Sequence, residues 1–509
     1  MNNVFFIRAE ETQFGSFHYP LGLIETSMSD SAWAFFKEVI GGVQPTSVDE
    51  QDEDALVHLA YEITSLFHEM RHFFDTFGTL AGLSLFSGRL TLLKEFVALA
   101  DTLLSMGMGW QLPLSTWALA ADCPKEIRDF VRRARAFDIS SEIYIAPFDP
   151  IEIDGHRDDM KIELDYARGG KADAFPLRIT LINEEGETES RTVLFPLGLE
   201  ALLEGSAHTL CRNLVDCYFP ESVAQRLQHR VQKITVLDEH GQTDQRAAQT
   251  STPYMVCDLL ITRFFQRHGI EQFPRDLILE LIDRALSTSF IRMLEPQPGM
   301  TAMYVERVGA RLVNILESED FNVLVSGATS DESEVMEAYE GMLANLEEGG
   351  EWQSIEDDHM PASSIAIWET YMAKSFIVPL FRQRLATGHR AFRSHDGFLE
   401  MLSKIGLPPA RVVNGKLMLG VMPPRVGGAW LHCLMLGEVM RQLVRGSGSV
   451  FCPRAHETVP GITTINFAYE GDCQSHRRLG CGTFRVGQPA GIVPKCLFED
   501  TMRVCALKR

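Results

Sequence analysis

The segment SLFHEMRHFFD, residues 65–75, lies within the longest helical pattern of the chain. Between residues 55 and 83, apolar side chains recur every three or four positions, which predicts one long helix with at most one stripe facing water. The apolar positions are Leu56, Leu59, Ile63, Leu66, Phe67, Met70, Phe73, Phe74, Phe77 and Leu80. The function of the chain turns on whether the histidines of this helix belong to its core or to a metal site.

His68 and His72 are four residues apart, so both imidazoles project from one face of the predicted helix, about one turn apart. Two imidazoles so placed can bind one zinc ion, and Glu69 beside them can act as a base toward the activated water. A polar row runs along the same helix: Tyr61, Ser65, His68, His72 and Asp75, flanked by Glu62 and Glu69. Ionisable groups stay aligned on a buried helix only when something pairs with them, and either a metal or a satisfied polar seam in a helical core does so.

The sequence HEMRH, residues 68–72, resembles the HExxH helix of the zincin metallopeptidases. The resemblance implies a Zn²⁺ held by His68 and His72, a zincin-like helical catalytic core, and hydrolysis of peptide bonds with Glu69 as general base. The position before the second histidine is usually uncharged in zincins, and here it is Arg71. We expect Arg71 to pair with Asp75 at the edge of the helix.

A catalytic zinc needs a third protein ligand and an open position for water. The metzincin subclass requires glycine at position 75 and histidine at position 78, but this chain has Asp75 and Gly78. Asp75 lies seven residues beyond His68, about 10 Å along the helix axis, and is therefore too far away to be a ligand. Two roles remain open for it: to accept a hydrogen bond from a ring nitrogen of His72, or to pair with Arg71 as an ordinary aspartate.

The segment LEALLEGSAHTL, residues 199–210, contains the best candidate for the third ligand. Glu204 lies at the border of its apolar face, and Gly205 and Ser206 follow with little side-chain bulk, which favours close approach to another helix. Glu204 is similar to the third ligand of gluzincins, a glutamate from a later helix. Glu200, one turn earlier, is the alternative, and a residue outside this segment is another. His208 is predicted to orient the carboxylate or to hydrogen-bond the developing oxyanion, unless it is a plain core histidine.

The remaining sequence predicts a mainly α (α+β) chain. Helices are expected near residues 90–107, 124–136, 197–219, 252–268, 275–289, 300–317, 333–346, 364–386 and 428–445, a short strand at 4–8, and a β-hairpin at 175–196. Polar stretches near residues 237–252 and 347–361 are candidate linkers or loops. We predict a catalytic region at 1–235, a helical region at 246–405 and a small mixed, Cys/Gly-rich C-terminal region at 406–509.

The composition limits the classes of partner that this chain is expected to bind. The 509 residues carry a formal net charge of -22, which argues against nucleic acid as a main partner. No run of about 18 apolar residues predicts a membrane span, and the apolar run at residues 4–7 is too short for a signal-peptide core. Scattered cysteines are typical of a reducing compartment. The chain is therefore expected to be cytoplasmic, with a protein or peptide substrate and no membrane partner.

The C-terminal region gathers potential zinc ligands, namely Cys452, His456, Cys473, His476, Cys481, Cys496 and Cys505. Their spacing contains no CxxC pair, so we do not predict a second, structural zinc there. The preferred interpretation is a zinc metalloprotease of restricted specificity, because the long helical part beyond residue 250 suits substrate recognition or binding of a regulatory protein. The alternative is a non-catalytic regulatory or binding protein with a structural zinc or no metal.

Overall fold

The computed structural model describes residues 15–18, 21–45, 52–111, 113–136, 161–164, 174–182, 188–196, 199–232, 252–270, 272–287, 308–318, 332–356, 361–414, 416–420 and 422–444. Helices dominate these residues, which confirms a mainly α chain. The helices are α1 (Asp30–Ile40), α2 (Glu53–Gly78), α3 (Leu80–Ser105), α4 (Leu114–Trp117), α5 (Lys125–Ala136), α6 (Leu199–Tyr218), α7 (Glu221–Gln232), α9 (Thr252–Arg267), α10 (Asp276–Ser287), α12 (Val308–Ser318), α14 (Glu332–Glu348), α15 (Pro361–Met372), α16 (Val378–Thr387), α17 (Arg390–Arg393), α18 (His395–Ile405) and α19 (Pro424–Val444), with a 3₁₀ turn η4 (Trp352–Ser354) and a π-helical segment η5 (Ala373–Ile377). The strands are β1 (Gly15–His18), β2 (Leu23–Thr26), β3 (Lys161–Leu164), β4 (Ala174–Ile182), β5 (Thr188–Pro196), β6 (Ala410–Val413) and β7 (Lys416–Leu419).

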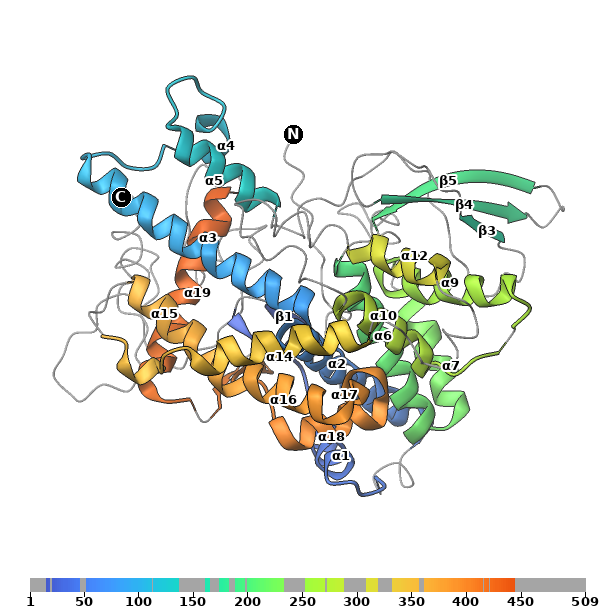
Figure 1. Ribbon diagram of the computed structural model, residues 1–509. Coiled ribbons are helices and arrows are strands. Elements are labelled where there is room, and N and C mark those ends of the chain that lie inside the picture. The colour runs from blue at the N-terminus through green and yellow to red at the C-terminus, as the bar shows by residue number, and fades with distance from the viewer. Residues whose placement is uncertain are drawn as a thin grey trace.

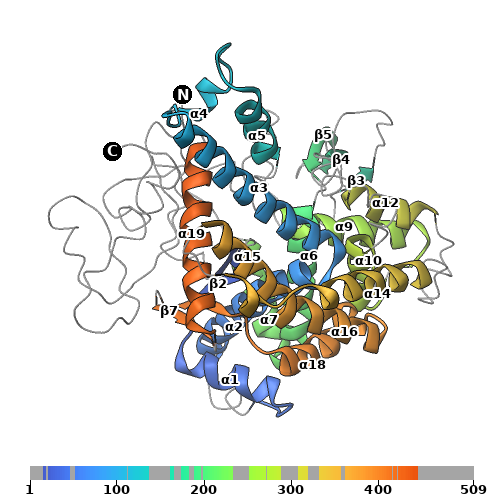
Figure 2. The same cartoon turned by 60° about the vertical axis from the view of Figure 1, so that its left-hand side comes forward.

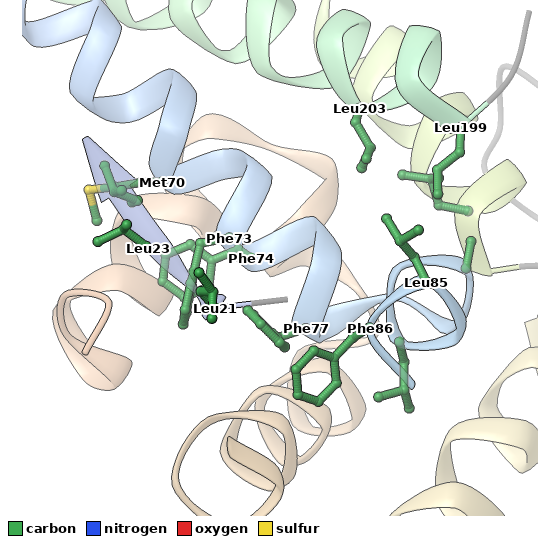
Figure 3. Packing of buried hydrophobic residues seen from close by; sticks show 14 of the residues in the cluster. Leu21, Leu23, Met70, Phe73, Phe74, Phe77, Leu85, Phe86, Leu199 and Leu203 are labelled. Carbon is green, nitrogen blue, oxygen red and sulfur yellow. The ribbon is translucent and has the colours of Figure 1, made fainter. Parts of the chain in front are cut away.

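Helix α2 runs through the middle of the molecule, with α6 along one side and α1 and α18 below it (Figure 1). Asp52 caps its N-terminus by accepting a hydrogen bond from the Ala55 amide at 2.8 Å. Its predicted apolar positions are buried, and Met70, Phe73, Phe74 and Phe77 lie in one cluster with the β2 residue Leu23 (Figure 3). The helix is thus covered on nearly all sides, as its sequence pattern predicts.

The predicted helix 55–83 is too long, because α2 ends at Gly78 and α3 begins at Leu80. The apolar period continues across this boundary, but Thr79 is extended (φ -119°, ψ 155°) and caps α3. Its hydroxyl accepts a hydrogen bond from the Gly82 amide at 3.1 Å and donates one to the Asp75 carbonyl at 2.6 Å. The chain turns there, and α3 leaves as a long helix that packs on α15 and α19 (Figure 2).

A small sheet joins the two ends of the described chain in the order β1-β2-β6-β7. Strand β2 is antiparallel to β1 and parallel to β6, with Leu23 opposite Ala410 and Thr26 opposite Val413. Both β1 and β2 pack against α2. Residues from the predicted regions 1–235 and 406–509 therefore build one sheet, while the predicted region boundaries themselves stay predictions.

The predicted β-hairpin is confirmed by β4 and β5, which pair antiparallel from Ala174 opposite Pro196 to Ile182 opposite Thr188. Strand β3 adds to β4, and this sheet projects at the periphery of the molecule (Figure 1). The expected strand at residues 4–8 and the cysteine-rich tail lie outside the described residues.

Helices α9, α10, α12, α14 and α19 fall on the segments that the periodicity predicts. The predicted helix 364–386 consists of α15 and α16 joined by the π-helical η5, where Pro379 near the start of α16 lacks a backbone donor. Helices α1, α7 and α18 were not predicted. In the part of the chain that the structure describes, no helix combines the length and the apolar character needed to cross a bilayer.

Candidate metal centre

Two helices supply the side chains of the candidate site, α2 and α6, which pack against each other. The predicted apolar face of α6 is buried through Leu199, Leu203 and Leu210. Figure 3 shows Leu199 and Leu203 pointing toward Leu85 of α3. Burial of this face fixes the rotation of α6, so that Glu204 at its border meets α2.

His68, His72 and Glu204 converge at one point. His68 Nε2 lies 2.9 Å from Glu204 Oε2 and 3.0 Å from His72 Nε2. The third edge of this triangle, from His72 Nε2 to Glu204 Oε2, measures 3.3 Å. Among the described residues, these three form the group of histidine and acidic side chains whose ligand atoms lie close enough to share one metal ion.

The donor set fits zinc by both chemistry and spacing. Imidazole nitrogens and a carboxylate oxygen are ordinary zinc ligands, and tetrahedral ligands at 2.0 to 2.2 Å from the ion lie about 3.4 Å from one another. The observed separations of 2.9 to 3.3 Å are tighter by only a few tenths of an ångström. Small side-chain rotations therefore suffice to open the triangle for an ion.

Glu204 is held in its ionised form. Burial opposes its charge, but the two imidazoles beside it more than offset the burial and hold the pKa of Glu204 below its ordinary value. Its side chain is 17% exposed and that of His68 is 15% exposed. The carboxylate is thus charged, mostly withdrawn from water and directed at two nitrogen ligands, as a metal-binding carboxylate must be.

The pKa of Glu69 is shifted in the opposite direction from that of Glu204. It is buried, and burial raises its pKa to about 8, with His68 opposing the rise and Glu204 and Glu25 adding to it. A bound divalent cation would favour the ionised form. A carboxyl group whose proton affinity lies close to neutrality, next to a ligand set, has the property that a general base and acid needs.

His208 lies one turn beyond Glu204 on α6 and is half-buried. Burial, followed by the neighbouring Arg212 and His68, lowers the pKa of His208 to about 3. The imidazole is therefore neutral at neutral pH and can donate one hydrogen bond. The predicted oxyanion role remains a prediction.

Asp75 takes the second of its two predicted roles. It accepts a hydrogen bond from Arg71 Nε at 3.0 Å, and both side chains are fully buried rather than at a helix edge. Among the described residues, His72 Nδ1 has no hydrogen-bond partner, so Asp75 does not orient that ring. The other predicted role, accepting a hydrogen bond from a ring nitrogen of His72, is wrong, because Asp75 Oδ2 faces the guanidinium of Arg71 instead.

The small residues after Glu204 lie at close contacts with two other helices, as predicted. A Cβ on Gly205 would lie 2.8 Å from Cys257 Cβ, so this glycine permits contact with α9 rather than with α2. Ser206 faces α2 instead, where its hydroxyl accepts a hydrogen bond from Arg71. Glu200 lies in the first turn of α6, and its side chain lies outside the described residues.

Sequence reasoning missed the contribution of the small sheet. Phe17 of β1 stacks on the His72 ring with 6.3 Å between ring centroids, and Glu25 of β2 acts electrostatically on Glu69. Short strands separated by loop residues gave no periodic signal to find them.

Glu62 of the polar row is structural, because it accepts hydrogen bonds from the amide and hydroxyl of Ser29, which caps α1.

Comparison with family models, curated proteins and solved structures gives no match to this chain.

Proposed function

We propose that this chain is a zinc-dependent peptidase of the gluzincin type, with His68, His72 and Glu204 as the metal ligands. The observation that carries the proposal is the convergence of their three donor atoms within 2.9 to 3.3 Å of one another. Two of these residues come from one helical turn and the third from a helix more than 130 positions away. Three protein ligands leave a position for water, as in catalytic rather than closed structural zinc sites.

Glu69 supplies the acid–base chemistry in this proposal. Zinc, when bound, would lower the pKa of a water molecule toward neutrality and polarise a substrate carbonyl. Glu69 would accept the proton of the attacking water and deliver it to the leaving amine. Its buried position and raised pKa support this role, because a group whose pKa lies near neutrality can both accept and release a proton in each cycle.

The substrate is proposed to be a protein or peptide, and the specificity restricted. Helices beyond residue 250, including α9, α10, α16 and α18, pack around α2 and α6, so much of the chain is available to limit access or to bind a regulatory partner. A cytoplasmic location belongs to the same proposal. It is supported by the described cysteines Cys123, Cys211, Cys217, Cys257 and Cys433, which are all free thiols.

Elemental analysis of the purified protein tests the metal site directly. We expect about one zinc per chain in the wild type and almost none in the double variant His68→Ala/His72→Ala, because one remaining ligand gives no site of useful affinity. Equal zinc content in the two proteins would refute the site. A library of fluorescence-quenched peptides, screened with the wild type and with Glu69→Gln, then separates a peptidase from a non-catalytic zinc protein.

A further inference from the structure

Arg71 lies between the two helices that supply the candidate ligands. Its Nε donates to Asp75 Oδ2 at 3.0 Å on its own helix and to Ser206 Oγ at 2.8 Å on α6. Its Nη2 donates to the backbone carbonyl of Phe392 in α17 at 2.8 Å. One buried guanidinium thus connects α2, α6 and α17.

The positions of these contacts along the chain are close to the ligands. Arg71 directly precedes His72, and Ser206 follows Glu204 by two residues. A shift of α6 along or around α2 would therefore break the Arg71–Ser206 hydrogen bond at the same time as it moved Glu204 away from the histidines.

Stability alone does not account for such a pair. Replacing a buried ion pair with apolar residues of similar volume is often neutral or stabilising, because desolvation of two charges is costly. The hydrogen bonding of this pair is also incomplete, since Arg71 Nη1 and Asp75 Oδ1 have no hydrogen-bond partner among the described residues. The charged pair differs from an apolar contact in being directional. Its hydrogen bonds have a fixed geometry and therefore admit only one relative placement of the helices.

We propose that Arg71, oriented by Asp75 and bonded to Ser206, is a positioning residue that sets the placement of α6 on α2 and so brings Glu204 to the histidine pair. This inference rests on the proposed zinc site. Arg71 acts through Ser206 and the helix backbones and does not itself contact the ligand atoms. A lysine cannot replace it, because an ammonium at the end of a flexible chain cannot reproduce the fixed fork of a guanidinium.

The test compares two hydroxyl deletions on α6. Ser206→Ala removes the acceptor for Arg71, whereas Thr209→Val removes a buried hydroxyl whose hydrogen bond among the described residues is to Gly205 O of its own helix, at 2.8 Å. Zinc affinity is measured by competition with a chelator, and the absorption spectrum of the Co²⁺-loaded protein reports ligand geometry. The unfolding temperature of the metal-free variants separates folding from metal binding.

We expect Ser206→Ala and Arg71→Lys to weaken zinc binding about 10- to 100-fold, in the range typical of residues that orient ligands, and to alter the Co²⁺ spectrum. Thr209→Val should keep wild-type affinity and spectrum. Wild-type behaviour of Ser206→Ala, or equal weakening in Ser206→Ala and Thr209→Val, would overturn the inference while leaving the zinc site in place. A wild-type protein that binds no zinc would overturn the proposed function together with it.

Discussion

His68 Nε2 lies 2.9 Å from Oε2 of Glu204, a residue 136 positions further along the chain. The contact joins α2 to α6 across a segment that includes the peripheral β-hairpin. An ionised carboxylate is costly to bury, so its placement against two imidazoles demands a compensating charge. Zinc would provide that charge.

Glu204→Ala should weaken zinc binding by more than about 100-fold, because loss of a direct ligand exceeds the 10- to 100-fold effects of residues that only orient ligands. The fold should persist, since α6 is held by its buried apolar face. Chelator competition gives the affinity, and circular dichroism checks the helix content. Glu62→Gln is the matched control, a buried glutamate of α2 that bonds Ser29 and should leave zinc affinity unchanged. Unaltered zinc binding in Glu204→Ala would exclude Glu204 as a ligand.

Glu69→Gln should keep the zinc and lose peptide hydrolysis by about two to four orders of magnitude, the usual contribution of general acid–base catalysis. The amide preserves the size of the side chain but cannot accept the proton of water. In the metal-free protein, burial raises the pKa of Glu69 to about 8, so the amide should not lower its stability through loss of a charge at neutral pH. Zinc content and cleavage rate are measured on the same preparation. Undiminished cleavage would place the chemistry elsewhere.

Part of the site was accessible from the sequence because it depends on local spacing. A spacing of four residues from His68 to His72 puts both rings on one helical face, and the structure places their Nε2 atoms 3.0 Å apart. Glu204 was inferred from its place at the border of an apolar face, and the burial of Leu203 and Leu210 beside it shows that this face was identified correctly. Periodicity carries this information because it reflects which side of a helix is buried.

Other features depend on contacts that no local pattern encodes. Arg71 was expected at a helix edge, but its environment is set by Ser206 and Phe392, far away in the chain. The end of α2 was misplaced because the apolar period continues past Thr79, where the extended backbone and the capping hydroxyl separate α2 from α3. Strands β1 and β2 were missed since four-residue strands give too few alternations to detect.

Acid should destabilise the protein partly through Asp283. Burial alone would raise its pKa, but the bidentate Arg384, at 2.8 and 3.0 Å, and Arg393 more than offset this and hold the pKa of Asp283 below its ordinary value. The ionised carboxylate therefore contributes stability above about pH 4, the ordinary pKa of aspartate, and this contribution is lost as the pH falls below it. Asp283→Asn should flatten the pH dependence of the urea midpoint between about pH 4 and pH 2.

The same variant should cost roughly 3 to 5 kcal/mol at pH 7, because it leaves the buried charge of Arg384 without its partner. Glu400→Gln is the control, since Glu400 pairs with Lys404 on the surface, where both side chains are about half exposed. Surface ion pairs contribute little to stability, so this variant should have the urea midpoint of the wild type at pH 7 and between about pH 4 and pH 2. Equal urea midpoints for Asp283→Asn and Glu400→Gln at pH 7 would contradict the assigned role of Asp283.

Gly78→Ala should destabilise the protein by about 1 to 3 kcal/mol through overpacking at the end of α2. A Cβ at this position would lie 2.2 Å from Cζ of Phe392, and that ring cannot retreat easily because the Arg384 guanidinium lies 3.6 Å from its centroid. Gly341→Ala is the opposite case, because a Cβ there meets nothing within 4 Å in the middle of α14. That change should stabilise the helix by about 0.5 to 1 kcal/mol. Urea unfolding of the two variants beside the wild type measures both effects, and a Gly78→Ala protein as stable as Gly341→Ala would show that the contact between α2 and Phe392 is looser than the structure places it.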